Sequence, residues 1–98
     1  MTENTSAAPI ELLLVDDDAD LRNDVASFLA TRGYRVQCCA DGEEAVEQAD
    51  RRAFNVAILD LSMPGMSGIE VLQKLKARDA ECEVVMLCLL YTSPSPRD

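Results

Sequence analysis

The chain of 98 residues is the size of one small domain, and its 48% hydrophobic content is enough for a core and too much for a disordered chain. Its 18 acidic and 9 basic residues give a net charge of −9, which repels nucleic-acid phosphates and anionic lipid headgroups. Histidine is absent, and this excludes histidine general bases, Ser-His or Cys-His nucleophile pairs and histidine-bearing zinc sites.

The N-terminal third predicts a polar tail, a buried strand and an amphipathic helix. Residues 1–9 lack the basic and apolar regions of a signal peptide and are expected to form a disordered tail. The apolar run 10–15 is typical of a strand buried on both faces of a parallel sheet. A helix then begins at an Asp18 N-cap and ends near Gly33, with apolar residues at helical spacing on one face: Leu21, Val25, Phe28 and Leu29.

The middle of the chain continues this alternation of strands and helices. Residues 34–38 alternate in polarity and are rich in strand formers, which predicts a second strand. A capping-box pattern at 41–44 opens a second helix, and 54–59 predict a third apolar strand that is followed by Asp60. Three residues of this second helix are expected to face inward: Ala45, Val46 and Ala49.

A loop, a third helix and a fourth strand complete the pattern. Proline and glycine mark 62–67 as a loop, and a capping box at 67–70 starts the helix. Residues 83–87 begin the fourth strand, and the whole order predicts an α/β fold with a parallel sheet between helices. The apolar side of the third helix is expected to hold Ile69, Leu72 and Leu75, with Val71 at its flank.

The four cysteines lack the spacing of a metal or redox motif. None forms a C-x-x-C pair, and the adjacent Cys38 and Cys39 are poorly placed to bridge each other. We expect reduced, structural thiols, with a redox or metal role as the alternative. No run reaches the ~18 apolar residues of a membrane span, so we expect a cytoplasmic protein without membrane attachment.

Acidic residues follow the first and third predicted strands. Asp16, Asp17 and Asp60 meet in one crevice if those strands are neighbours, because parallel strands end at the same edge of a sheet. Like charges at ~4 Å repel by ~4 kcal/mol at an intermediate dielectric, so the cluster needs a raised pKa or a bound cation. Ligands that are all oxygen favour Mg²⁺. The alternative is that the acidic residues 16–18 only cap the first helix and favour its dipole.

Two other acidic sites fit this sequence less well. An EF-hand loop that starts at Asp16 requires glycine at its sixth position and glutamate at its twelfth, where this chain has Leu21 and Ser27. A phosphatase of the haloacid-dehalogenase type also uses an aspartate at a strand end, but with a second aspartate two residues later. That position is Ser62 here, and this phosphatase is kept as an alternative.

Three segments closely resemble the receiver domain of two-component response regulators: 12–22, 40–45 and 56–70. The pair Asp16-Asp17 together with the pattern L-D-x-x-M-P-x-x-x-G carries the resemblance, which covers residues 10–87. It implies a flavodoxin-like, doubly wound parallel sheet of which this chain holds the first four of five strands. It also implies the strand order 2-1-3-4-5, which places the first and third strands side by side.

The resemblance further implies that Asp60 accepts a phosphoryl group from a sensor histidine kinase or a phosphotransfer protein. Mg²⁺ is then held by Asp60, by Asp17 directly, by Asp16 mostly through water, and by the backbone carbonyl of Ser62. Gly68 is expected to let the third helix begin close to the sheet. We expect no enzymatic output and no direct nucleic-acid binding by this segment. The alternative is a pseudo-receiver, an unphosphorylated scaffold that binds partners through its surface.

The chain departs from the receiver pattern after its fourth strand. The position of the family's switch serine or threonine is Cys88, and the only lysines, Lys74 and Lys76, lie in the third helix, far from the crevice. Residues 88–98 resemble the translation of a sequencing-library adapter, and we interpret them as a non-native or disordered tail. The expected domain is therefore a truncated receiver over residues 10–87, with an unknown output domain.

Overall fold

The computed structural model describes residues 9–61 and 65–87, and within them it confirms the predicted order of strands and helices. The predicted tails, 1–9 and 88–98, lie outside the described residues except for Pro9, and Ser62 lies outside them as well. In chain order the elements are β1 Glu11–Val15, α1 Ala19–Thr31, β2 Arg35–Cys39, α2 Gly42–Arg51, β3 Val56–Asp60, α3 Gly68–Arg78 and β4 Glu83–Leu87.

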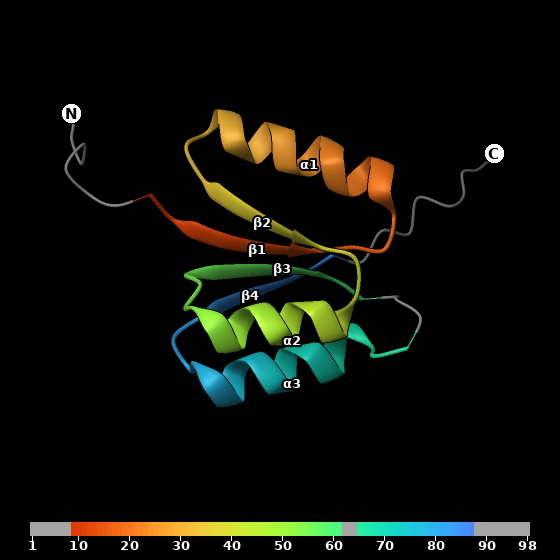
Figure 1. Cartoon of the computed structure of the whole chain (residues 1–98), viewed down its shortest axis with the longest axis vertical. Coiled ribbons are helices and arrows are strands. Elements are labelled where there is room, and N and C mark those ends of the chain that lie inside the picture. The colour runs from red at the N-terminus through yellow and green to blue at the C-terminus, as the bar shows by residue number, and fades with distance from the viewer. Residues whose placement is uncertain (1–8, 62–64, 88–98) are drawn as a thin grey trace.

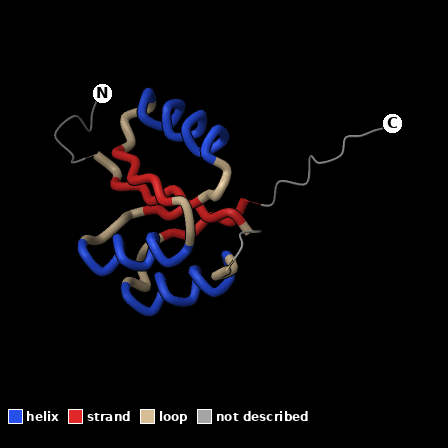
Figure 2. The backbone as a smooth tube through the Cα atoms, turned by 45° about the vertical axis from the view of Figure 1, so that its right-hand side comes forward, coloured by secondary structure: helices blue, strands red, loops and turns tan. Residues whose placement is uncertain are grey.

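The four strands form one parallel sheet in the order β2-β1-β3-β4. Helix α1 covers one face of this sheet, and α2 and α3 cover the other (Figure 1). Figure 2 shows the same three layers from a second direction. In the register of β1 and β3, Val15 lies opposite Leu59, so the next residues of the two segments, Asp16 and Asp60, lie side by side. The α/β doubly wound fold is therefore as predicted.

Local signals in the sequence set where the helices start and where α1 stops. The side chains of Asp18, Asp41 and Ser67 each accept a hydrogen bond from the backbone N–H three residues later, at 3.1, 2.8 and 3.2 Å. Helix α1 stops before Gly33, which has a φ of 93° and donates its N–H to the carbonyl of Ala30 at 3.1 Å. Glycine adopts this left-handed conformation without the steric cost that other residues incur.

The main hydrophobic core lies between the sheet and helices α2 and α3. Alternate residues of the central strands face this side, and the two helices contribute one apolar stripe each. Two of the cysteines, Cys39 and Cys82, are buried in this core as free thiols. The buried members are Leu13, Val15, Cys39, Ala45, Phe54, Ala57, Leu59, Val71, Leu75 and Cys82.

Two helix faces differ from the prediction. In α3 the predicted core residue Ile69 is 48% exposed, whereas Val71 is fully buried. The buried stripe of α3 runs through Gly68, Val71 and Leu75, and Ile69 is one residue away from it, about 100° around the helix. The prediction was wrong because Gly68 is placed directly against the sheet, and this rotates the helix relative to its apolar pattern.

In helix α1 one predicted core residue is exposed, whereas the other three, Leu21, Val25 and Leu29, lie on the half-buried face as predicted. Phe28, predicted to be inward, is 56% exposed, and its ring lies 4.8 Å from the guanidinium carbon of Arg32. Arg22 and Ala26, which were not predicted to face inward, are also half-buried. No helix in the described ranges is long and apolar enough to cross a lipid bilayer.

Candidate functional site

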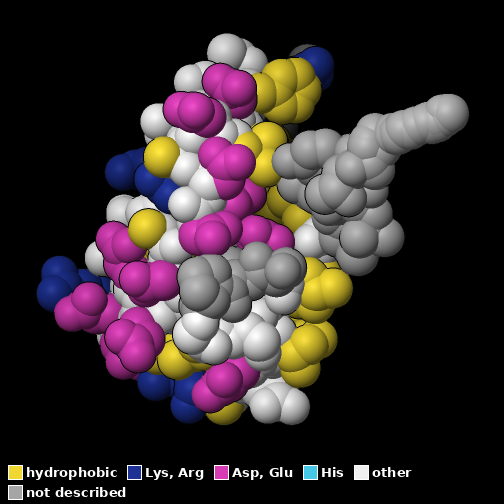
Figure 3. All heavy atoms as spheres, turned by 90° about the vertical axis from the view of Figure 1, so that its right-hand side faces the viewer, with side chains coloured by type: hydrophobic (Ala, Val, Ile, Leu, Met, Phe, Trp, Pro, Cys, Tyr) yellow, Lys and Arg dark blue, Asp and Glu magenta, His cyan; other side chains and the backbone are white. Residues whose placement is uncertain are grey.

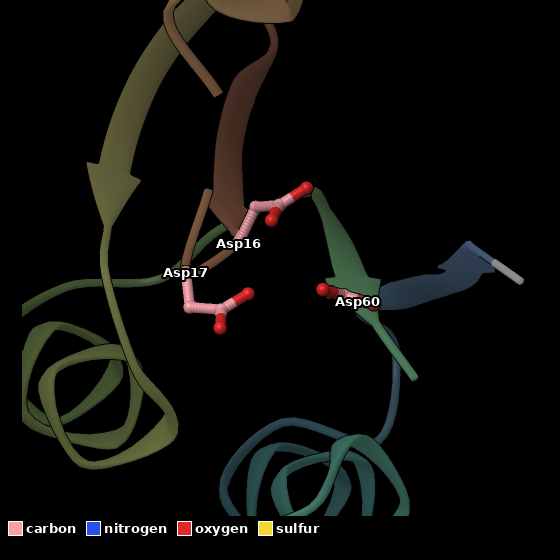
Figure 4. Close-up of side chains that lie close together, drawn as sticks. All are labelled: Asp16, Asp17 and Asp60. Atoms are coloured by element: carbon pink, nitrogen blue, oxygen red, sulfur yellow. The ribbon is translucent and has the colours of Figure 1, made fainter. Parts of the chain in front are cut away.

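Three carboxylates meet at the edge of the sheet where the strands end. Asp16 and Asp17 directly follow β1, and Asp60 is the last residue of the neighbouring β3. One carboxylate oxygen from each of the three lies within 4.8 Å of the others, and we call this group the acidic triad. Asp17 and Asp60 point toward each other, with Asp16 beside them (Figure 4). The structure thus brings together the three acidic residues that the sequence singled out.

The members of the acidic triad differ in their exposure to solvent. Asp16 is only 2% exposed, Asp60 is half-buried and Asp17 is exposed. Burial raises the pKa of Asp16, a backbone hydrogen bond from Asp18 opposes this shift, and the negative charges of Asp60, Asp17 and Asp18 raise it further. A cation bound here would relieve the repulsion among the three carboxylates.

Hydrogen bonds at the end of β1 hold Asp16 in place. Its N–H donates to the carbonyl of Cys39 on β2 at 3.1 Å, and its Oδ1 accepts the N–H of Asp18 at 2.9 Å. Its carbonyl accepts a hydrogen bond from Nη1 of Arg22 at 2.7 Å. Sequence reasoning missed Arg22, although it is the only basic residue from position 16 through position 31.

Asp60 is positioned by a close approach between β3 and the start of α3. A Cβ atom built on Gly68 would lie 2.6 Å from the backbone oxygen of Asp60 and 3.0 Å from Cα of Leu61. Only glycine fits at this distance, so the expectation that Gly68 lets α3 begin close to the sheet is confirmed. The N–H of Leu61 donates to the carbonyl of Leu87 at 3.1 Å, which ties the end of β3 to β4.

The donor set of the acidic triad fits a hard divalent cation. All three donors are carboxylate oxygens, which Mg²⁺ prefers, and they approach from two neighbouring strands. Acidic side chains also gather across the face of the molecule at this end of the strands (Figure 3). The fourth predicted ligand, the Ser62 carbonyl, lies outside the described residues. Lys76 donates to the carbonyls of Ala80 and Cys82 before β4 and therefore lies at the opposite edge of the sheet, as expected.

A cavity of about 280 Å³ lies at that opposite edge, between the C-terminal ends of α2 and α3. Buried side chains of Phe54, Leu75 and Cys82 form part of its wall. The charged groups at its rim are already in contact with partners: Arg78 with Asp50 across the two helices, and Arg52 with the Phe54 ring. The cavity is thus separate from the acidic triad, and cations at its rim complement the negative ends of two helix dipoles.

Comparisons with known proteins point to one family. The family model described as "Response regulator receiver domain" matches residues 12–94. The transcriptional activator protein PfeR of Pseudomonas aeruginosa is 40% identical over 78 residues, which cover 80% of this chain and 26% of that protein. The regulatory protein VanRB of Enterococcus faecalis is 37% identical over 81 residues, covering 83% of this chain and 36% of that protein. The chain thus spans about a quarter to a third of these relatives.

A relative of a different kind and a solved structure extend this pattern. A cyclic di-GMP phosphodiesterase of Thermotoga maritima is 38% identical over 76 residues, covering 78% of this chain and 20% of that protein. The structure of the Vibrio cholerae chemotaxis protein CheY4 superposes with a TM-score of 0.77 at 33% identity, covering 81% of this chain and 68% of that one. The same fold and the same family therefore emerge from sequence and from structure.

Proposed function

The chain belongs to the response regulator receiver family, and from this premise we propose that Asp60 is a phosphoacceptor that works with Mg²⁺ held by the acidic triad. The donor is a phosphohistidine of a sensor histidine kinase or of a phosphotransfer protein. One observation carries the proposal: carboxylate oxygens of Asp16, Asp17 and Asp60 lie within 4.8 Å of one another at the ends of two neighbouring strands.

The proposed reaction is a phosphoryl transfer onto a carboxylate. An oxygen of Asp60 attacks the phosphorus atom, the P–N bond to the donor imidazole breaks, and the electron pair of that bond remains on the nitrogen. The product is an aspartyl phosphate at Asp60. The 98 residues contain no histidine, so none of them is the donor.

The residues of the acidic triad take different parts in this proposal. Mg²⁺, when held by these residues, would neutralise and orient the phosphoryl oxygens. Asp17 is exposed and is proposed to contact the metal directly. Asp16 is buried, with one oxygen bonded to the Asp18 N–H, and is proposed to act mostly through water. The backbone carbonyl of Ser62 is the further proposed ligand.

We assign these residues a signalling role in two-component regulation and no enzymatic output of their own. The names of PfeR and VanRB, a transcriptional activator and a regulatory protein, support this role. We also propose a cytoplasmic location and no direct binding of nucleic acid, which the net charge of −9 disfavours.

Phosphorylation by acetyl phosphate in the presence of Mg²⁺ tests the proposal. We expect mass spectrometry to find one phosphoryl group on Asp60, absent from Asp60→Asn and present in Asp24→Asn, which removes the same charge from an exposed acid of α1. No modification of the wild-type chain would support the scaffold alternative. Release of phosphate over many turnovers would support the phosphatase alternative.

A further inference from the structure

We infer that Arg22 is a positioning residue for the acidic triad. Its guanidinium holds the peptide between Asp16 and Asp17 in the orientation that points the Asp17 carboxylate at Asp60. The inference rests on the proposed function, because Mg²⁺ binding is one of its readouts. It concerns a residue of α1 that does not itself contact the metal or the phosphoryl group.

The carbonyl of Asp16 lies where the β1–β2 ladder ends. The N–H of Asp16 still pairs with Cys39, the last residue of β2, at 3.1 Å. Strand β2 ends at Cys39, so the ladder does not continue to the carbonyl of Asp16. A buried carbonyl needs a donor, and Nη1 of Arg22 supplies it at 2.7 Å. The bond is charge-assisted, which makes it stronger than one between neutral groups.

Asp17 depends on its backbone for its direction. Its exposed carboxylate accepts no hydrogen bond from any residue within 9–61 and 65–87. Its neighbours are both anchored: Asp18 donates its N–H to Oδ1 of Asp16 at 2.9 Å, and the Asp16 carbonyl is held by Arg22. Loss of the Arg22 bond therefore frees the peptide that precedes Asp17. The Asp17 carboxylate is then no longer held in the direction of Asp60.

The charge of Arg22 and its hydrogen bond act on Mg²⁺ binding in opposite directions. A cation close to the acidic triad repels Mg²⁺, so on charge alone the removal of Arg22 would tighten metal binding. Positioning predicts weaker binding, since loss of the groups that orient metal ligands costs about tenfold or more in affinity. The direction of the change thus separates the two effects.

The test uses the complete 98-residue chain and three variants. Arg22→Met removes both charge and donor, and we expect the dissociation constant for Mg²⁺ to rise about tenfold. Arg22→Lys keeps a cationic donor and should restore affinity to within about threefold of the wild type. Arg32→Met removes the same charge at the far end of α1 and should leave the affinity unchanged. Calorimetric titration measures all four proteins.

A second readout does not involve the metal. In the metal-free protein the ¹³C chemical shift of the Asp16 carbonyl reports its hydrogen bond, and we expect it to move in Arg22→Met and to recover in Arg22→Lys. An unchanged shift in Arg22→Met would overturn the inference. If Arg22→Met does not fold, Arg22→Gln, which keeps only a short neutral donor, takes its place with the same criteria.

The two proposals fail in different ways. If the wild-type chain does not bind Mg²⁺, the proposed metal site is wrong, and the role of Arg22 is wrong with it. If the wild type binds Mg²⁺ and Arg22→Met binds it equally well or more tightly, only the inference about Arg22 is refuted.

Discussion

Substitution of Gly68 by alanine should strain the junction between β3 and α3. The added Cβ would lie 2.6 Å from the backbone oxygen of Asp60, 2.8 Å from Cε of Met86 and 3.0 Å from Cα of Leu61. The Met86 methyl group ends a flexible side chain and can move away. The Asp60 oxygen belongs to β3, which is paired on both sides, and it yields only if the strand or the helix shifts.

The cost follows from these distances. A carbon–oxygen contact of about 3.3 Å is normal, so the junction must open by roughly 0.7 Å. Overpacking of this kind costs about 1–3 kcal/mol. The higher helix propensity of alanine returns at most ~1 kcal/mol. We therefore expect Gly68→Ala to lower the free energy of unfolding by about 1–2 kcal/mol and to weaken Mg²⁺ binding, because Asp60 moves.

Urea denaturation monitored by circular dichroism, together with the backbone amide spectrum, measures both effects. Gly42→Ala is the matched control, since Gly42 also begins a helix but its Cβ would meet side-chain atoms of Val71 and Met66. It should lose stability without displacing the Asp60 signals. Wild-type stability in Gly68→Ala would refute the argument, as would full rescue of its stability by Met86→Ala in the double variant.

Three further predictions concern the acidic triad and the core. Asp17→Asn should weaken Mg²⁺ binding, which we expect to be millimolar or tighter in the wild type, and equal affinities by calorimetry would show that the assignment is wrong. Asp16→Asn should raise the free energy of unfolding of the metal-free chain at neutral pH by about 1 kcal/mol, because it removes a buried charge beside two others. The folded-state pKa of Asp16 is raised above 3.8, so the free energy of unfolding of the wild type should fall as the pH rises from 3.8 through that pKa. Urea denaturation at a series of pH values should show this fall in the wild type and not in Asp16→Asn. Burial raises the pKa of Cys39 to about 12, so alkylation near pH 8, followed by mass spectrometry, should label Cys39 only in denaturant; equal labelling of the folded chain would contradict this.

Short-range signals in the sequence were sufficient for the elements and their ends. The caps Asp18, Asp41 and Ser67 act within one helical turn, and the left-handed Gly33 terminates α1 through its own backbone conformation. The residues of the acidic triad could also be predicted from the sequence, because Asp16, Asp17 and Asp60 come at the ends of apolar strands. Their proximity, however, depended on the order of the strands, which only the resemblance to receivers supplied.

Tertiary contacts decided which helix faces are buried and how the acidic triad is held. Val71 replaced Ile69 in the core because the approach of Gly68 to Asp60 sets the rotation of α3. Arg22 reaches the Asp16 carbonyl because the turn between β1 and α1 brings the first turn of that helix back beside the end of the strand. A helical pattern defines an apolar stripe from residues within two turns, whereas the surface it meets is assembled from segments distant in sequence. For that reason the contacts by which Gly68 and Arg22 position the carboxylates could be identified only from the folded structure.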